Sequence, residues 1–226
     1  MREFISLLSA VAVAFCLIAS EASATTMTFT SSAAFNLALG GSPVTIEGWD
    51  TYALNSTIAN GTTLNGVTYN AFPGGTLGRI DNQFNHFGTD SLALRRSSDP
   101  NPNKSFFNPG DVLSISFAKP IYVLGIFFNA NFTNVGSLGI LTTPIGTVTT
   151  GGPTYDTGTF YFAGVISTTP FTSATIGSNT KRSSSFNLDN LTFTSSVPDR
   201  LGFLTPALVL GALCALGFRI RRPGLE

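Results

Sequence analysis

The sequence predicts an all-β fold, an antiparallel and jelly-roll-like β-sandwich that occupies residues 25–196. Composition is the first indication, because this region is rich in Thr and Phe, which favour strands, and in Gly, Pro and Asn, which interrupt them. Spacing is the second, because about ten strand-like segments follow one another with turn residues between them, as in sandwiches. The third is that no helical periodicity persists over about ten residues.

The expected strands can be placed along the chain. Asn65-Gly66 separates two short strands, and this dipeptide is a strong signal for a two-residue hairpin. From Val112 to Phe117 polar and apolar residues alternate, which predicts a strand with one solvent-exposed and one buried face. The segment 121–130 is more uniformly apolar, as in a central strand, and Pro120 suits a strand start. The expected strands are 44–49, 62–64, 67–71, 92–94, 112–117, 121–130, 137–142, 146–150, 157–163, 171–176 and 185–193, with one short helical turn near 32–38.

The N-terminal 24 residues have the layout of a secretion signal. Arg2 supplies the positive start, and residues 5–18 are almost entirely apolar but short for a membrane span. Ala22-Ser23-Ala24 has the small-x-small form that signal peptidase requires. We expect cleavage after Ala24.

The C-terminal residues 197–226 predict a transmembrane helix. Leu201–Phe218 is uncharged, and as a helix it would reach roughly 27 Å, close to the hydrocarbon thickness of a bilayer. Arg219, Arg221 and Arg222 follow at once, and such a cluster stays on the cytoplasmic side. With a cleaved leader, the domain is expected outside and the tail in the inner membrane. A glycolipid-anchor signal is the alternative, but its tail normally lacks terminal arginines.

Composition and motifs argue against several functions of the domain. The chain has no net charge and scattered Lys and Arg, so nucleic acid is not an expected partner. Cys16 and Cys214 lie outside the domain, which excludes disulfides and thiol catalysis within it. His86 is the single histidine, so a catalytic triad lacks its usual base. We therefore expect no enzyme, although a glycoside hydrolase needs only two carboxylates and is the least favoured alternative.

Two low-specificity binding sites can be suggested. Calcium prefers oxygen ligands, and Glu47 and Asp50 at the first expected strand, with Asp189 and Asn190 in the last, could supply them. Alternation along the last strand prevents all four from converging directly, and edge or turn hydrogen bonds are the competing interpretation. Carbohydrate binding needs exposed aromatic rings, for which the candidates are Trp49 and Tyr52; a core position for Trp49 is the competing interpretation.

The tail resembles a known family. Ser196-Val197-Pro198, the apolar span and the terminal arginines are similar to the PEP-CTERM sorting tail of exported proteins from Gram-negative bacteria that make exopolysaccharide. The family motif is Val-Pro-Glu-Pro; here Val197-Pro198 is followed by Asp199, which keeps the acid, and by Arg200, which replaces the second proline. The resemblance implies processing near Val197, Pro198 and Asp199 by an exosortase-type enzyme.

The second half of the domain also resembles the body of PEP-CTERM proteins. The segments that carry the resemblance are 117–125, 162–166, 170–173 and the closing segment 186–193. The resemblance implies a jelly-roll sandwich of the kind that carbohydrate-binding modules also use. We therefore expect a non-catalytic, exported cell-surface or matrix protein, adhesive within exopolysaccharide or biofilm, with a carbohydrate-binding module as the alternative.

Overall fold

The computed structural model describes residues 24–82, 88, 90–95, 106–130, 138–152, 156, 160–179 and 185–198. The expected transmembrane helix and the signal up to residue 23 lie outside these ranges. Within them, no helix has the length and apolarity needed to cross a membrane.

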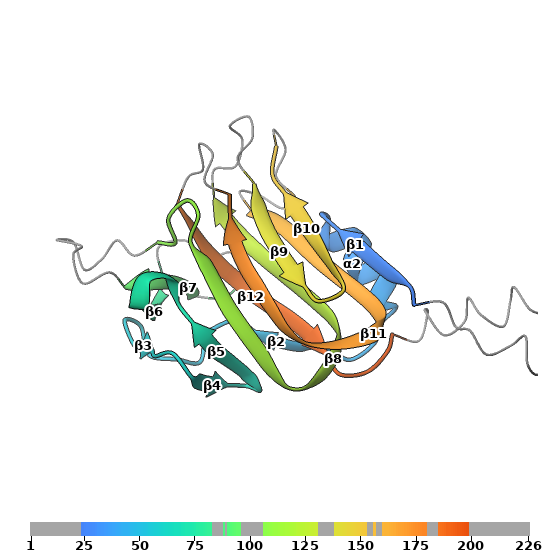
Figure 1. Cartoon of the computed structure of the whole chain (residues 1–226), viewed down its shortest axis with the longest axis horizontal. Coiled ribbons are helices and arrows are strands. Elements are labelled where there is room, and N and C mark those ends of the chain that lie inside the picture. Colours follow the sequence, from blue (N-terminus) through green and yellow to red (C-terminus); the bar gives the residue numbers. More distant parts are fainter. Residues whose placement is uncertain are drawn as a thin grey trace, which may run out of the picture.

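The described chain forms strands in every region, with antiparallel pairing throughout, so the prediction of an all-β antiparallel domain is confirmed (Figure 1). One eight-residue α-helix and one 3-10 turn interrupt the strands. The elements are β1 (Thr26–Phe29), α2 (Ser32–Leu39), β2 (Thr45–Glu47), β3 (Thr57–Ile58), β4 (Thr62–Leu64), β5 (Val67–Ala71), η1 (Pro73–Gly75), β6 (Leu77–Asp81), β7 (Ser91–Arg95), β8 (Val112–Ala130), β9 (Gly139–Thr143), β10 (Gly146–Thr150), β11 (Phe160–Ser178) and β12 (Phe186–Thr194).

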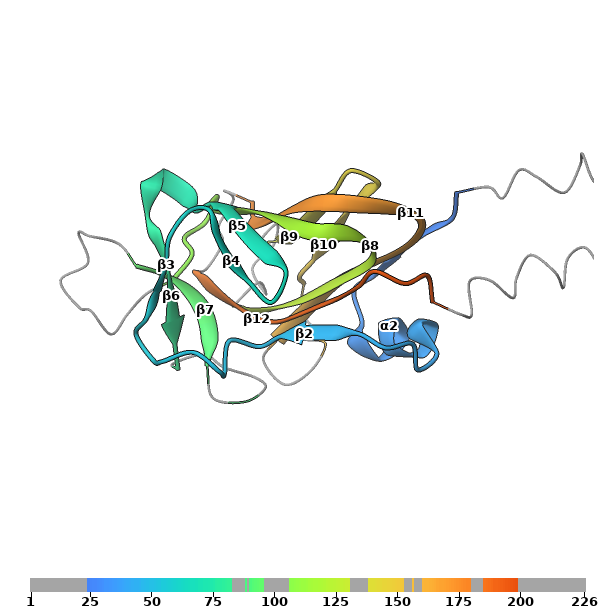
Figure 2. The ribbon, with the colours of Figure 1, turned by 90° about the horizontal axis from the view of Figure 1, so that it is seen from below.

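Two long strands, β8 and β11, turn the sheet into two layers. Residues 112–117 of β8 pair with β5 and with residues 173–177 of β11, whereas residues 123–130 pair with β12 and with residues 160–166 of β11. Figure 2 shows β5 above β12, with β8 passing between the two levels at its bend. The upper layer consists of β4, β5, the first half of β8, the second half of β11, β9 and β10. The lower layer consists of the other strands together with the second half of β8 and the first half of β11.

The bends coincide with prolines. The β8–β11 ladder is regular up to the pair Ile166 and Val123, then shifts register on either side of Phe171. Pro120 and Pro170 lie in this interval, and a proline lacks the N–H that a ladder needs. The sequence predicts a strand boundary at each proline and so divides each long strand into two. The chain in fact continues through both.

The main core lies between the layers. Inward residues of the upper layer, such as Ile115 and Ile176, face inward residues of the lower layer, such as Leu124 and Phe128. Burying one such side chain stabilises the fold by roughly 1.5 to 3 kcal/mol, which makes this core the main source of stability. The largest fully buried side chains of this core are Trp49, Tyr69, Tyr161, Phe107, Phe128 and Phe186.

A second, smaller core forms where α2 covers the outer face of the lower layer. The helix begins at Ser31, whose hydroxyl accepts a hydrogen bond from the backbone N–H of Ala34 (3.4 Å), and ends at Gly40, which adopts φ 63°. Asp156 adds an acceptor at the start of the helix, because its carboxylate accepts a hydrogen bond from the N–H of Ser32 (3.0 Å). Phe35 and Leu39 are the buried side chains of the helix.

Two glycines make room for the helix. Gly125 of β8 and Gly164 of β11 are direct cross-strand partners. A Cβ at Gly164 would lie 2.7 Å from carbon atoms of both Phe35 and Phe162, and one at Gly125 would lie 3.0 Å from Phe35. The glycine pair is therefore a notch in the sheet into which the Phe35 ring fits.

Candidate functional site

Glu47 is the centre of a buried hydrogen-bond network at the end of β2. Its side chain is only 1% exposed. One carboxylate oxygen accepts a hydrogen bond from the backbone N–H of Trp49 (3.1 Å). The other accepts from the amide of Asn65 (2.8 Å) and the hydroxyl of Tyr52 (3.1 Å). The Trp49 indole N–H in turn donates to the hydroxyl of Tyr69 (2.8 Å), so the network joins β2, the β4–β5 turn and β5.

Local backbone conformation sets up this network. Asn65 and Gly66 adopt φ 46° and 84°, the left-handed conformations that a two-residue hairpin turn requires. The Asn65-Gly66 hairpin is thus formed as predicted, between β4 and β5. Trp49 also has positive φ, 61°, which is uncommon for a bulky residue. The N–H of Trp49 donates to Glu47 and its ring is buried, and these contacts offset the energetic cost of the positive φ.

Burial decides the protonation of the two tyrosines. Burial raises the pKa of Tyr69 far above its usual range, and the nearby Glu47 charge raises it further. Burial also raises the pKa of Tyr52, with the Glu47 charge and hydrogen bond acting in the same direction. Both hydroxyls therefore stay neutral at physiological pH. Because both carboxylate oxygens of Glu47 already accept hydrogen bonds, we interpret this network as structural.

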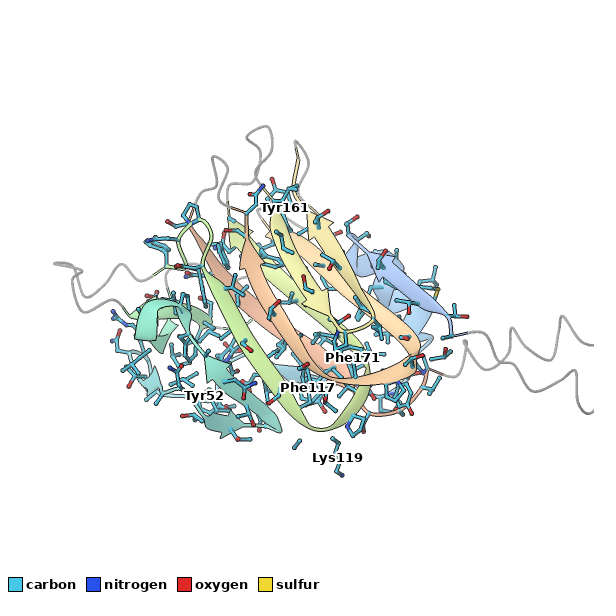
Figure 3. All side chains as sticks on the ribbon, in the orientation of Figure 1. Tyr52, Phe117, Lys119, Tyr161 and Phe171 are labelled. Atoms are coloured by element: carbon cyan, nitrogen blue, oxygen red, sulfur yellow. The ribbon has the colours of Figure 1, made fainter. Side chains whose placement is uncertain are left out.

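The assignment of Trp49 to sugar stacking is wrong. The Trp49 side chain is 2% exposed and belongs to the core between the layers, so neither ring face is open to a ligand. Tyr52 is half-buried, packs against the same core and donates its hydroxyl to Glu47. Figure 3 shows Tyr52 on the side of the molecule where β3 and β4 lie.

The four residues suggested for calcium do not converge on one point. Asp50 and Asn190 come close together, since an oxygen of each lies within 3.2 Å of the point where a Cβ of Gly48 would stand. Glu47 pairs with Leu191, which faces the main core. Asp189 pairs with Phe127, which faces the core under α2 on the opposite side of the layer.

A β-bulge explains this separation. Asn190 adopts φ 45°, and the β12–β8 register shifts between Asp189 and Thr192. The extra residue turns Leu191 to the face opposite Asp189. Asp50 is occupied as well, because its carboxylate accepts a hydrogen bond from the N–H of Asp90 (2.9 Å). Across the described residues, no three His, Cys, Asp or Glu side chains are grouped to hold a metal ion.

The residues predicted for processing flank the strands. Ala24 is exposed and precedes β1, while Val197 is 39% exposed and Pro198 is buried just after β12. Ala22, Asp199, Arg219, Arg221, Arg222 and His86 lie outside the described residues.

A groove that the sequence analysis did not identify lies between the layers beside the β8 bend. It has a volume of about 440 Å³, within the range of ligand pockets. The rings of Phe117 and Phe193 lie side by side within it, with centroids 5.2 Å apart, and Lys119 stands out from the bend of β8 (Figure 3). Its described lining residues include no Asp or Glu. They are Pro43, Val44, Thr45, Asn65, Gly66, Phe117, Ala118, Lys119, Ile121, Phe193, Thr194, Ser195 and Ser196.

No sequence motif could have revealed this groove, because its lining comes from four separate segments of the chain. Its polar groups are also partly occupied. The Asn65 amide donates to Glu47 and to Tyr52, and Phe117 and Phe193 are 7% and 8% exposed. The groove has space for a small ligand, but its aromatic rings present little free surface.

Neither a protein-family model nor a curated protein matches this chain.

Proposed function

We propose that the chain is a non-catalytic, exported protein whose jelly-roll-like β-sandwich, residues 25–196, is held at the outer face of the inner membrane by the tail, residues 197–226. Signal peptidase removes the leader, and an exosortase-type enzyme acts on the tail. The domain then belongs to the cell surface or to the extracellular polysaccharide matrix.

One observation carries this proposal: the two ends of the described body leave it along one edge. Thr194 of β12 pairs with Val123, Val123 pairs with Ile166, and Ile166 pairs with Met27 of β1. These residues form one row across four strands, so three strand spacings, about 14 Å, separate the two exits. Both exits lie at the right-hand end of the molecule in Figures 1 and 2.

The positions of the exits support processing at the expected points. Thr25 is already tied to the body, because its N–H donates to the hydroxyl of Thr168 (2.9 Å) and its carbonyl accepts from the N–H of Thr168 (3.0 Å). β1 begins at Thr26, two residues after Ala24, and β12 ends at Thr194, before Val197. Cleavage at both points would therefore leave every described strand intact.

Fractionation of cells that express the full chain tests the proposal. Removing residues 201–226 should convert a membrane-bound protein into a soluble, folded one in the periplasm or medium. Replacing Arg219, Arg221 and Arg222 by Gln should weaken retention at the membrane, because the positive charges keep that end cytoplasmic. A matched control replaces three cations of the body, Lys119, Lys181 and Arg182, by Gln and should remain membrane-bound. A truncated chain that stays in the membrane fraction, or that no longer folds, would contradict the proposal.

A further inference from the structure

The outer face of the upper layer carries two rows of hydroxyl side chains. Cross-strand partners point to the same face of a sheet, so the register of the strands identifies each row. The first row crosses β4, β5, β8 and β11, and the second crosses β8, β11, β9 and β10. The rows consist of Thr63, Thr68, Ser116 and Ser173, and of Ser114, Thr175, Thr142 and Thr147.

Neighbouring hydroxyls within the rows hold one another in place. The hydroxyls of Thr63 and Thr68 lie 2.8 Å apart, and the Thr147 hydroxyl donates to that of Thr142 (3.3 Å). Ser116 donates to the side-chain oxygen of Asn70 (3.2 Å). These contacts are between exposed groups, and a β-branched Thr in a strand has few rotamers. The face is therefore ordered before any ligand arrives, which lowers the entropy that binding costs.

The face has an unusual composition. Among the described residues, none that points outward from the paired parts of the upper-layer strands carries a charge, whereas about a quarter of residues in typical domains do. Without charge, the face offers no complementarity to nucleic acid or to an acidic or basic peptide. The described outward residues of these strands also include no Trp, Tyr or Arg, the residues that usually anchor protein partners.

We propose that this hydroxyl face binds a neutral polysaccharide. Each Ser and Thr hydroxyl can both donate and accept a hydrogen bond, as sugar hydroxyls do, and no charge has to be desolvated. The strands that carry successive members of a row are about 4.8 Å apart. Single contacts of this kind are weak, but a polymer meets many of them at once, and its affinity grows accordingly.

The twist of the sheet favours a particular form of polymer. Adjacent strands are rotated by about 20 to 25°, so a row across four strands turns by roughly 60 to 75°. A flexible single chain can follow that turn, whereas a flat crystalline surface cannot. The expected ligand is therefore a soluble neutral polysaccharide rather than a crystalline one. This proposal adds a ligand to the function proposed above and rests on it, because the chain meets such a polymer only if it is exported.

Binding of the full chain in mild detergent to an immobilised soluble β-glucan tests the proposal. Replacing Ser116 by Ala and Thr142 and Thr175 by Val should weaken binding on the order of tenfold, since three hydrogen-bonding groups are lost. A variant with Ser116→Thr, Thr142→Ser and Thr175→Ser keeps all three hydroxyls and should bind nearly as well as the natural chain. A charged control, Ala33→Glu with Asn36→Glu on the exposed side of α2, should leave binding unchanged, because α2 covers the other layer.

The same assay distinguishes the alternatives. Loss of binding with Lys119→Gln, but not with the Ser116, Thr142 and Thr175 variant, would place the sugar in the groove and overturn the proposal. So would stronger binding to polygalacturonate than to the neutral glucan, or no binding to either polymer. The emission of Trp49 shows whether each variant is folded. Because purified protein is used, a negative result here leaves the export proposal, which fractionation tests, unaffected.

Discussion

Replacing Gly164 by Ala should destabilise the domain measurably, because the notch that receives Phe35 has no space for a methyl group. The added Cβ would lie 2.7 Å from Phe35 and from Phe162, whereas carbon atoms in van der Waals contact are about 3.5 to 4.0 Å apart. Phe35 cannot move away easily. It is 1% exposed and lies between the rings of Phe29 and Phe162, with centroid distances of 5.6 and 5.0 Å.

The expected cost follows from this geometry. Forcing an extra methyl group into a well-packed site typically costs about 1 to 3 kcal/mol. For a domain of this size, 1 kcal/mol corresponds to about 2 to 4 °C, so the melting temperature should fall by roughly 2 to 12 °C. The chain has a single tryptophan, Trp49, which is buried in the main core, so its fluorescence during thermal unfolding reports on the whole domain.

A second substitution makes the test specific. Phe35→Leu alone should destabilise the chain by leaving space in the notch, but combined with Gly164→Ala it should recover part of the loss, because the smaller side chain accommodates the methyl group. The two changes are then less costly together than the sum of their separate effects. Strictly additive effects, or an unchanged melting temperature for Gly164→Ala, would contradict the close packing of Phe35 against Gly164.

Two further predictions concern protons and metal. Burial keeps Tyr69 protonated in the folded state, while the unfolded chain loses this proton near pH 10, so the contribution of Tyr69 to stability should be constant below about pH 10 and should fall above it by up to about 1.4 kcal/mol per pH unit. In urea denaturation above pH 10, Tyr69→Phe should make the fall of stability with pH shallower by the equivalent of one proton, and an unchanged slope would contradict the burial argument. Because Glu47 and Asp189 face opposite sides of the lower layer, millimolar calcium or EDTA should shift the melting temperature by less than about 1 °C; a clear rise with calcium would instead support the metal site suggested by the sequence.

The sequence predicts the local features of this fold well. The Asn65-Gly66 turn, the alternation from Val112 to Phe117 and the short helix near Ser32 depend on neighbouring residues, and all are present. Prediction from the sequence fails where contacts between distant segments determine whether a strand forms. β1 and β6 were not predicted, because β1 is only four residues long and β6 contains Gly78, Arg79 and Asp81; pairing with β11 and with β7 makes them strands.

The candidate sites depend on distant contacts even more strongly. The burial of Trp49 follows from packing against the core of two layers, which a single segment cannot reveal. The separation of Glu47 from Asp189 depends on the left-handed Asn190, and a β-bulge has no clear signature in this sequence. The hydroxyl rows are visible only after the register is known, because their eight members come from six strand segments.

The masses of the mature protein and of its terminal peptides, isolated from the surface or medium of a native producing cell, test the proposed export and processing most directly. We predict a chain that begins at Thr25 and ends within a few residues of Val197, with all described strands retained. A full-length chain recovered from the cytosol, with Met1 and Glu226 both present, would contradict this prediction.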